Sequence, residues 1–290
     1  MPLTTTVSML RKAQEQGFAV GAFNVENMEM AQAIISAAEE LRAPVILQTT
    51  PSTVRYAGTG MYAAMVAALA QEATVPVAMH LDHGDSFALC AQALRSGYTS
   101  VMIDGSKLPL EENIALTYKV SEMCAAVDVP VEGEIGRVGG KEDDLESDGG
   151  YTIPEEAVRF EKESGLFSMA VGVGTAHGFY KEKPQLNKEL ITTLRGMLQA
   201  PMVLHGASGL SDEDVKDCIR RGICKVNFAT ELRAAYTEGV KAVLAENPKT
   251  FDPKAYGKEA RQRRCAMPPS IISACSRYWP GMVFITWSSS

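Results

Sequence analysis

The sequence of 290 residues lacks the features that mark several protein classes. No run approaches the roughly 20 apolar residues that a membrane-spanning helix needs, and the segment before Gln16 lacks the apolar stretch of a secretory signal. The six cysteines include no C-x-x-C pair, so we expect free thiols in a reducing compartment. These absences predict a cytoplasmic protein with no membrane partner.

An excess of basic residues is also missing. The net charge is −7, which argues against a nucleic-acid-binding face, because such a face is basic. Hydrophobic residues make up 46% of the chain and charged residues 22%, as in a folded globular protein. An acidic protein can still bind an anionic substrate, because backbone N–H groups at a helix N-terminus can hold a phosphate.

Short apolar runs rich in β-forming residues recur along the chain, and segments with helical periodicity lie between them. The expected strands are 19–24, 44–49, 76–81, 100–104, 130–135, 168–174, 201–205 and 223–228. Alternating strand and helix signals predict a parallel sheet, and eight units predict a closed (β/α)8 TIM barrel of class α/β, formed as a single domain. The alternative is an open doubly wound sheet, but no dinucleotide fingerprint follows the first strand to favour it.

The end of the chain has a different pattern. We expect the barrel domain to cover residues 1–260 and an atypical tail to cover 261–290, where neither helical nor strand periodicity is clean. The tail is interpreted as an appendage, an oligomer contact or a sequence artefact such as a shifted reading frame.

The four histidines occupy related positions. His80, His83, His177 and His205 lie at or just after the predicted ends of strands three, six and seven, at the barrel face that carries active sites. Imidazole is the commonest metal ligand near neutral pH, and three imidazoles form an open catalytic site. We predict His83, His177 and His205 as ligands and interpret His80, one step deeper, as a hydrogen-bonded core residue.

Charged residues occur inside the predicted strands, where they are costly unless paired or bound to metal. Glu132 and Glu134 share one face of strand five, because strand side chains alternate. Lys225 and Asn227 share a face of strand eight for the same reason. An ion pair between Lys225 and Glu132 is the structural alternative to a catalytic role for the lysine.

Two glycine-bearing turns, at 174–178 and 205–209, include histidines of the predicted ligand set. Strand eight leads directly into a helix at Thr230. Barrel enzymes often bind phosphate in the loops after strands seven and eight, at a helix N-terminus. Ser208 and Thr230 can add hydroxyl donors; the alternative is that these two residues only cap helices.

The segment 136–150 is polar and rich in glycine and acidic residues. Loops of this length and composition are often lids that close over a site, and closure would bring Glu142 or Asp143 to a substrate. The alternative interpretation is a solvated acidic loop.

Six motifs, in order and at matching spacing over residues 5–260, resemble the class II zinc-dependent ketose-bisphosphate aldolases of the tagatose- and fructose-bisphosphate type. The motifs are HLDHG at 80–84, VEGEIG at 131–136, GGKED at 139–143, GTAHG at 174–178, HGASG at 205–209 and KVNFATEL at 225–232. The resemblance fades after about Arg264, where family members usually continue with helical sequence.

The resemblance implies roles for the predicted residues. His83, His177 and His205 would hold a catalytic Zn2+. Asp82 would transfer the proton of the substrate's C4 hydroxyl, and Glu142 would handle the C3 proton. Cleavage of a ketose 1,6-bisphosphate would give dihydroxyacetone phosphate and glyceraldehyde 3-phosphate.

The same resemblance implies a second, buried metal position at Asp104 and Glu134, and Na+ or K+ beside the phosphate. Asn24 would lie near the substrate. The residues expected around the phosphate are Gly178, Gly206, Ala207, Ser208, Asn227, Phe228, Ala229 and Thr230. Family members form homodimers or homotetramers.

Three alternatives remain from the sequence. One is an aldolase for another phosphorylated ketose or keto acid. A second is a metal-dependent hydrolase on the same barrel, although the first strand lacks the H-x-H pair common in those enzymes. The third is a related non-catalytic barrel subunit that supports an aldolase complex, although such a subunit need not keep the metal ligands that are present here.

Overall fold

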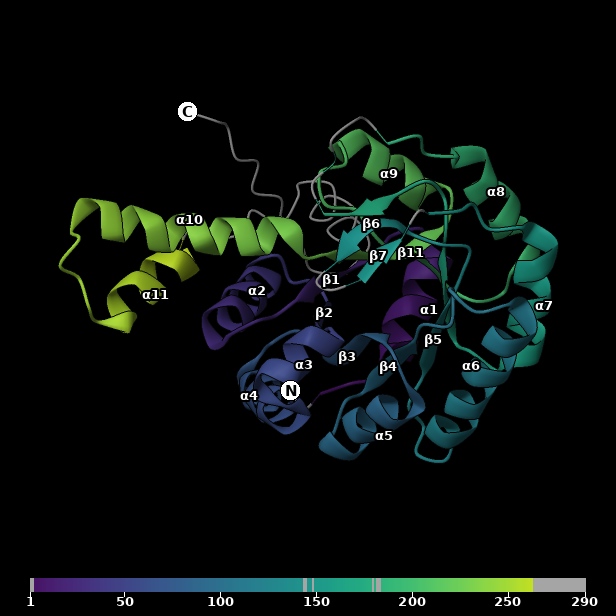
Figure 1. Cartoon of the computed structure of the whole chain (residues 1–290), viewed down its shortest axis with the longest axis horizontal. Helices are drawn as coiled ribbons and strands as arrows, with labels where there is room; N and C mark the ends of the chain where they lie inside the picture. Colours follow the sequence, from purple (N-terminus) through teal and green to yellow (C-terminus); the bar gives the residue numbers. More distant parts are fainter. Residues whose placement is uncertain (1–2, 143–144, 148, 179, 181–183, 263–290) are drawn as a thin grey trace.

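Eight parallel strands close into a barrel in the computed structural model, which describes residues 3–142, 145–147, 149–178, 180 and 184–262 (Figure 1). The order around the barrel is β1-β11-β10-β8-β5-β4-β3-β2. The strands are β1 (Val20–Asn24), β2 (Val45–Thr49), β3 (Val77–Gly84), β4 (Ser100–Ile103), β5 (Val131–Ile135), β8 (Ser168–Val171), β10 (Met202–Leu204) and β11 (Ile223–Phe228). The predicted (β/α)8 barrel is confirmed.

Every residue of these eight strands is buried, because helices cover the outer face and side chains fill the interior. Strands buried on both faces have nearly continuous apolar sequence, which is why the eight runs were visible in the sequence. Two predicted ends were wrong. The third strand continues through Gly84 instead of ending at Leu81, and the sixth ends at Val171 instead of Gly174.

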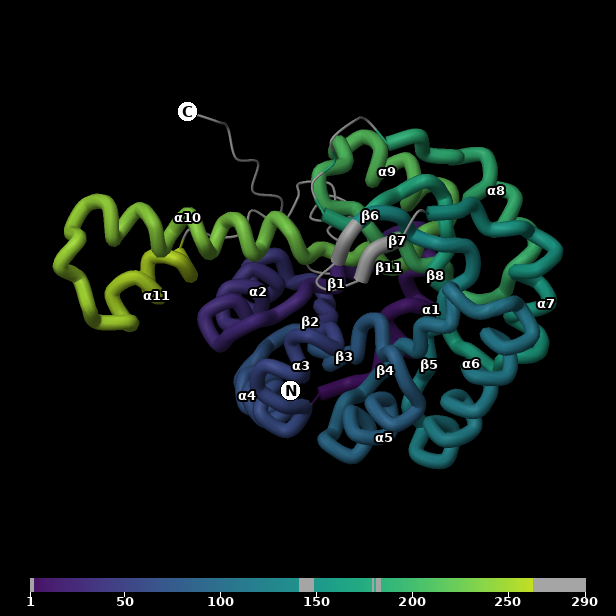
Figure 2. Tube along the Cα trace, viewed as in Figure 1, coloured from purple at the N-terminus to yellow at the C-terminus, as the bar shows by residue number. Residues whose placement is uncertain are grey.

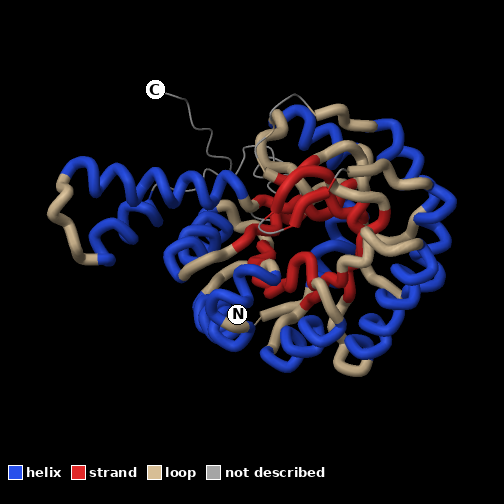
Figure 3. The backbone as a smooth tube through the Cα atoms, viewed as in Figure 1, coloured by secondary structure: helices blue, strands red, loops and turns tan. Residues whose placement is uncertain are grey.

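Most of the helices surround the strands as an outer ring (Figure 3). The described helices are α1 (Thr6–Gln16), α2 (Met28–Glu40), α3 (Pro51–Ala57), α4 (Thr59–Glu72), α5 (Phe87–Ser96), α6 (Leu110–Ala125), α7 (Pro154–Ser164), α8 (Lys188–Met197), α9 (Asp212–Arg220), α10 (Thr230–Glu246) and α11 (Pro253–Gln262). Side-chain caps begin several of them; Asn27 Oδ1, for example, accepts the Met30 N–H at 2.9 Å. None of the described helices combines the length and apolar character that crossing a membrane requires.

The first and last helices leave the regular pattern. The chain before α1 bonds to the start of a barrel strand, since the Thr4 N–H donates to the Val77 carbonyl at 2.9 Å, so α1 lies at the amino-terminal end of the barrel. At the other end of the chain, α10 and α11 pack against each other and project away from the barrel beside α2 (Figure 2). The predicted tail lies outside the described residues beyond Gln262.

A small second sheet occupies part of the segment that was predicted to be an irregular loop. The strands β6 (Gly139–Glu142) and β7 (Leu145–Ser147) are antiparallel, and β6 also pairs in parallel with β9 (Ala176–His177). The interpretation of 136–150 as wholly loop is therefore wrong in its backbone. The pairing of β6 with β9 brings the segment against the turn that carries His177.

Candidate functional site

The third strand, β3, contains a β-bulge between Leu81 and Gly84, where two of the predicted site residues lie. Between β3 and β4, Leu81 is paired with Val101 and Gly84 with Ile103, so β3 has one extra residue. His83 lies in the bulge with φ +48°, a conformation that L residues rarely adopt. Strand alternation would point Asp82 and His83 to opposite faces, but the bulge lets both point into the site.

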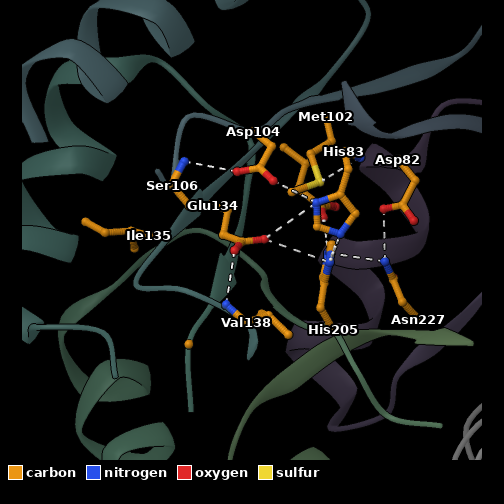
Figure 4. A network of polar contacts seen from close by, with 12 residues as sticks. Asp82, His83, Met102, Asp104, Ser106, Glu134, Ile135, Val138, His205 and Asn227 are labelled. Atoms are coloured by element: carbon orange, nitrogen blue, oxygen red, sulfur yellow. Dashed lines mark hydrogen bonds and ion pairs between the residues drawn. The ribbon is translucent and has the colours of Figure 1, made fainter. Parts of the chain in front are cut away.

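A thioether stabilises this bulge. The His83 N–H donates to Met102 Sδ at 3.4 Å, and Met102 is completely buried on the neighbouring strand (Figure 4). The N–H that the bulge removes from the strand ladder therefore still has an acceptor, as buried backbone groups require. The contact therefore stabilises the backbone conformation of His83.

Three of the four histidines come together at the barrel mouth. His83 from β3, His177 from β9 and His205 from the residue after β10 each offer a ring nitrogen within 4.8 Å of the others. The ring centroids of His83 and His205 are 4.6 Å apart, and those of His83 and His177 are 5.1 Å apart. His80 belongs to neither donor group found among the described residues, as its predicted core role requires.

Two of these rings are each bound to a carboxylate on the side away from the other ring. His83 Nδ1 lies 2.9 Å from Asp104 Oδ2 (Figure 4). His205 Nε2 lies 3.0 Å from Glu132 Oε1. A carboxylate only accepts, so each outer nitrogen carries the ring proton. The inner nitrogens, His83 Nε2 and His205 Nδ1, then direct lone pairs at each other across 2.9 Å.

Two lone pairs at that distance repel unless a cation lies with them, so this arrangement fits a metal ion. Burial lowers the pKa of His205 to about 4, which keeps the ring neutral at pH 7, the form that ligates metals. The three histidines form an open N3 set of the kind found in catalytic zinc sites.

A second donor group shares His83 with Asp104 and Glu134. Burial by itself raises the pKa of Asp104, but the hydrogen bond from His83 and those from Ser106 together bring that pKa well below its usual range. Burial and the charge of Asp104 raise the pKa of Glu134 to about 8. Glu134 Oε2 accepts no hydrogen bond from the described residues, and it lies 3.9 Å from ring nitrogens of His83 and His205. A buried oxygen without a donor also fits a cation.

The pKa of Glu134 gives a prediction for the metal-free protein. Because the pKa of this carboxyl is higher in the folded chain than in the unfolded chain, the folded protein loses stability as the pH rises from about 4.5 to about 8. Glu134→Gln removes this loss, so the difference in Tm between variant and parent should grow by a few degrees between pH 5 and pH 8.5 in chelator. Calorimetry at both values tests this; a difference independent of pH would contradict it.

Asp82 is held beside the three histidines by two amides. Gln48 Nε2 donates to Asp82 Oδ2 at 2.9 Å, and Asn227 Nδ2 donates to Asp82 Oδ1 at 3.1 Å. Gln48 Nε2 also donates to Asn24 Oδ1 at 2.7 Å, which joins two predicted residues from different strands. Gln48 was missed by sequence reasoning, although its polar side chain in the apolar run of strand two was a usable signal.

A pocket lies directly beside this carboxylate. It is lined by Asn24, His177, Gly178, Gly206, Ser208, Asn227, Ala229, Thr230 and Arg233. Eight of these nine residues were predicted as ligands of the metal or substrate. Ala207 and Phe228 were also predicted but are not among the lining residues; the Phe228 ring stacks on Phe23 in the core, with centroids 5.7 Å apart. Arg233 was not predicted.

Several features of the pocket suit an anion. The helix α10 begins at Thr230 without a side-chain cap, and Ala229 and Thr230 line the pocket, so the positive end of the helix dipole lies at the pocket. Ser208 does not cap a helix; its hydroxyl lies 3.5 Å from the Ala229 nitrogen, and α9 is capped by Ser211. The guanidinium of Arg233 adds positive charge and is held by Glu26 at 2.6 Å.

A glycine permits the two turns of this pocket to meet. Gly206 has φ +64°, and a Cβ there would lie 2.7 Å from the backbone of Ala176. The turn after β10 can therefore contact the strand that carries His177, and this contact closes one wall of the pocket. The side chain of Glu142 and the whole of Asp143, predicted for the same site, lie outside the described part of the chain.

Comparisons with known proteins identify the family and agree with the fold. A model of the family "Fructose-bisphosphate aldolase class-II" matches residues 4–276, which extends beyond Arg264. The crystal structure of the YdjI aldolase from Escherichia coli K12 is 34% identical with a TM-score of 0.84, covering 96% of this chain and 100% of that chain. The fructose-bisphosphate aldolase Fba of Campylobacter jejuni has the same fold at 23% identity and a TM-score of 0.74, covering 93% and 91%.

Proposed function

The chain belongs to the class II fructose-bisphosphate aldolase family and is a metal-dependent aldolase, and from this premise we propose that it cleaves fructose or tagatose 1,6-bisphosphate reversibly with a bound Zn2+. The products are dihydroxyacetone phosphate and glyceraldehyde 3-phosphate. The observation that carries the proposal is the meeting of three ring nitrogens, one amide-held carboxylate and an anion pocket at one barrel mouth.

The metal is assigned to the three-histidine set. Bound there, a zinc ion supplies Lewis acidity for the ketone oxygen on which negative charge develops, worth several kcal/mol. Asp104 and Glu134, which lie near His83 Nδ1, are the proposed second position. The two positions share one imidazole, so occupancy of either changes what His83 offers to the other.

Two carboxylates divide the proton transfers. Asp82 accepts the proton of the C4 hydroxyl as the C3–C4 bond breaks and C4 becomes the aldehyde carbon. The electron pair of that bond remains with the ketone half, and Glu142 then donates a proton to C3. Asn227 and Gln48 keep both oxygens of Asp82 in place through their amide groups, at 3.1 and 2.9 Å.

The phosphate of the ketone half is placed in the pocket at the start of α10. Support comes from the uncapped helix N-terminus, the Ser208 hydroxyl and the Arg233 guanidinium around one pocket. Arg233 is also bound to Glu26, so the arginine is already oriented before a phosphate arrives. Na+ or K+ beside the phosphate remains a prediction from the family resemblance.

A coupled cleavage assay tests the function. Purified protein is given fructose 1,6-bisphosphate and tagatose 1,6-bisphosphate in parallel, with chelator and after zinc is restored. We expect triose-phosphate release that chelation abolishes and zinc restores, and the ratio of the two rates identifies the preferred sugar, since the substrates differ only at C4. Release from neither sugar by zinc-loaded protein would contradict the proposed substrates.

Glu142→Ala provides a second, independent prediction. The variant should slow exchange of the C3 proton of dihydroxyacetone phosphate with solvent by about 10²-fold or more, the range for a general acid–base residue, while the binding of this ligand changes little. Proton NMR in deuterated water measures the exchange, and calorimetry measures the binding. Exchange at the parental rate would show that the segment carrying Glu142 only covers the site.

Assembly is proposed as a homodimer or homotetramer. Light scattering of the eluting protein distinguishes these from a monomer. A requirement for a second, related barrel chain would appear in the coupled cleavage assay as activity that rises on addition of that chain, and full activity of the purified homo-oligomer would contradict it.

A further inference from the structure

A layer of charged side chains lies inside the barrel, directly below the three histidines. Lys225 of β11, Glu132 of β5 and His80 of β3 are each no more than 1% exposed. Barrel interiors are normally filled by branched apolar residues. A buried ion pair is rarely more stabilising than apolar residues of the same volume, so this layer calls for another explanation than stability.

The contacts connect the layer to the metal site through a single residue. Lys225 Nζ donates to Glu132 Oε2 at 2.8 Å, which is the ion pair predicted from the sequence as the alternative to a catalytic lysine. Glu132 Oε1 lies 3.0 Å from His205 Nε2. Each oxygen of the carboxylate thus has its own partner. Because β5 and β11 are not neighbours in the barrel, the connection crosses the interior.

His80 completes the orientation of the lysine. His80 Nε2 lies 3.4 Å from Lys225 Nζ, and His80 Nδ1 lies 2.8 Å from Ser100 Oγ. An ammonium group only donates, so His80 Nε2 accepts and its ring proton is on Nδ1, toward the serine. Lys225 is therefore fixed from two sides, and it presents an N–H to one particular oxygen of Glu132.

Resting on the zinc site of the proposed function, we propose that Glu132 and Lys225 are positioning residues that hold His205 in the tautomer protonated on Nε2. Only this tautomer directs a lone pair from Nδ1 toward His83 and the metal. The opposite tautomer would place an N–H inside the donor set and would exclude a cation.

The arrangement makes Glu132→Gln a sharp test, because glutamine has the same shape but distinct ends. Lys225 donates, so it selects the carbonyl end of the glutamine, and the NH2 end is left facing His205 Nε2. His205 must then accept at Nε2 and carry its proton on Nδ1. We expect the affinity for Zn2+ to fall by about 10- to 100-fold, the usual effect of changing a partner behind a metal ligand.

The double variant Glu132→Gln/Lys225→Met separates positioning from damage. Without the lysine, the glutamine can rotate its carbonyl toward His205 Nε2, and the metal-binding tautomer returns. The double variant should therefore bind zinc more tightly than Glu132→Gln alone, whereas simple disruption of the core would make it weaker. Ser168→Ala is the matched control, since Ser168 contacts the same Glu132 Oε2 at 3.5 Å but neither His205 nor Lys225 depends on it.

Two readouts are needed, and neither is activity. Zinc affinity is measured by competition with a chromophoric chelator, and the protonation of each ring nitrogen is measured from ¹⁵N chemical shifts of the metal-free protein. The chain has four histidines, so single-histidine variants assign the spectrum. We expect protonated Nε2 on His205 in the parent and in Ser168→Ala, and unprotonated Nε2 in Glu132→Gln.

Parental zinc affinity in Glu132→Gln, or a parental His205 that is unprotonated at Nε2, would overturn the proposal. If Glu132→Gln does not fold, the parental spectrum alone still decides. Failure of the proposed function would be distinguishable from failure of this proposal. Zinc binding without cleavage of either sugar would contradict the substrate assignment, but the ¹⁵N shifts would still report the tautomer of His205.

Discussion

Replacement of His83 by alanine is expected to remove bound zinc and to lower kcat/KM for cleavage by about 10³-fold or more. Loss of a Lewis acid forfeits several kcal/mol, and each 1.4 kcal/mol or so corresponds to a factor of ten. His83 should be the most sensitive of the three ligands because it belongs to both donor groups. Its Nε2 faces His205 at 2.9 Å, and its Nδ1 faces Asp104 at 2.9 Å.

Asp104→Asn gives the graded comparison. That change weakens the second donor group and places an amide behind His83 but leaves the three imidazoles, so zinc should bind more weakly than in the parent. With zinc in excess, activity should still exceed that of His83→Ala. Metal content by atomic emission and steady-state kinetics on the same preparations measure both effects. Full activity with one zinc per chain in His83→Ala would exclude it as a ligand.

The barrel was predictable because its strands are buried on both faces. Runs such as Pro44–Thr49 and Ile223–Phe228 are continuous and apolar enough to be seen in one sequence, and the structure places strands at Val45–Thr49 and Ile223–Phe228. Charged residues inside such runs were informative for the same reason. The pairing of Lys225 with Glu132 followed from the cost of leaving either one unpaired in a strand.

The bulge at His83 was not predictable from local sequence. A positive φ is usually signalled by glycine or asparagine, and histidine gives no such signal. The conformation depends on Met102, which is 19 residues away and accepts the displaced N–H. Sequence reasoning therefore ended strand three at Leu81 and placed the ligand in a loop, although the prediction that His83 faces the site did not need the bulge.

Partners that come from distant strands were missed more completely. Gln48 is 34 residues from Asp82, and Arg233 is 207 residues from Glu26; only the closed barrel brings either pair together. The hairpin of β6 and β7 was missed because β6 depends on pairing with β9, which is a non-local contact. Local composition identified the segment as polar and glycine-rich, but it does not encode that pairing.

Asp82→Asn should retain zinc and lose about 10²- to 10⁴-fold in kcat for cleavage. Asp82 lies in neither donor group, so the metal is unaffected, and the loss is that of a general base. Asparagine keeps the shape of the side chain, but only its carbonyl end can accept, so one of the two amides, that of Gln48 or that of Asn227, has to rotate. Asp85→Asn is the matched control, because Asp85 is an exposed carboxylate three residues away, paired with Arg55 at 3.7 Å. Parental turnover in Asp82→Asn would remove its role.

The two carboxylates can then be separated by reaction. Exchange of the C3 proton of dihydroxyacetone phosphate involves no C4 hydroxyl, because the product has only three carbons. Asp82→Asn should therefore keep this exchange near the parental rate while losing cleavage, and Glu142→Ala should lose both, because cleavage also needs a proton at C3. Loss of exchange in Asp82→Asn would mean that Asp82, held by the amides of Gln48 and Asn227, also takes part in the transfer of the C3 proton. That result would contradict the assignment of the C4 proton to Asp82 and of the C3 proton to Glu142.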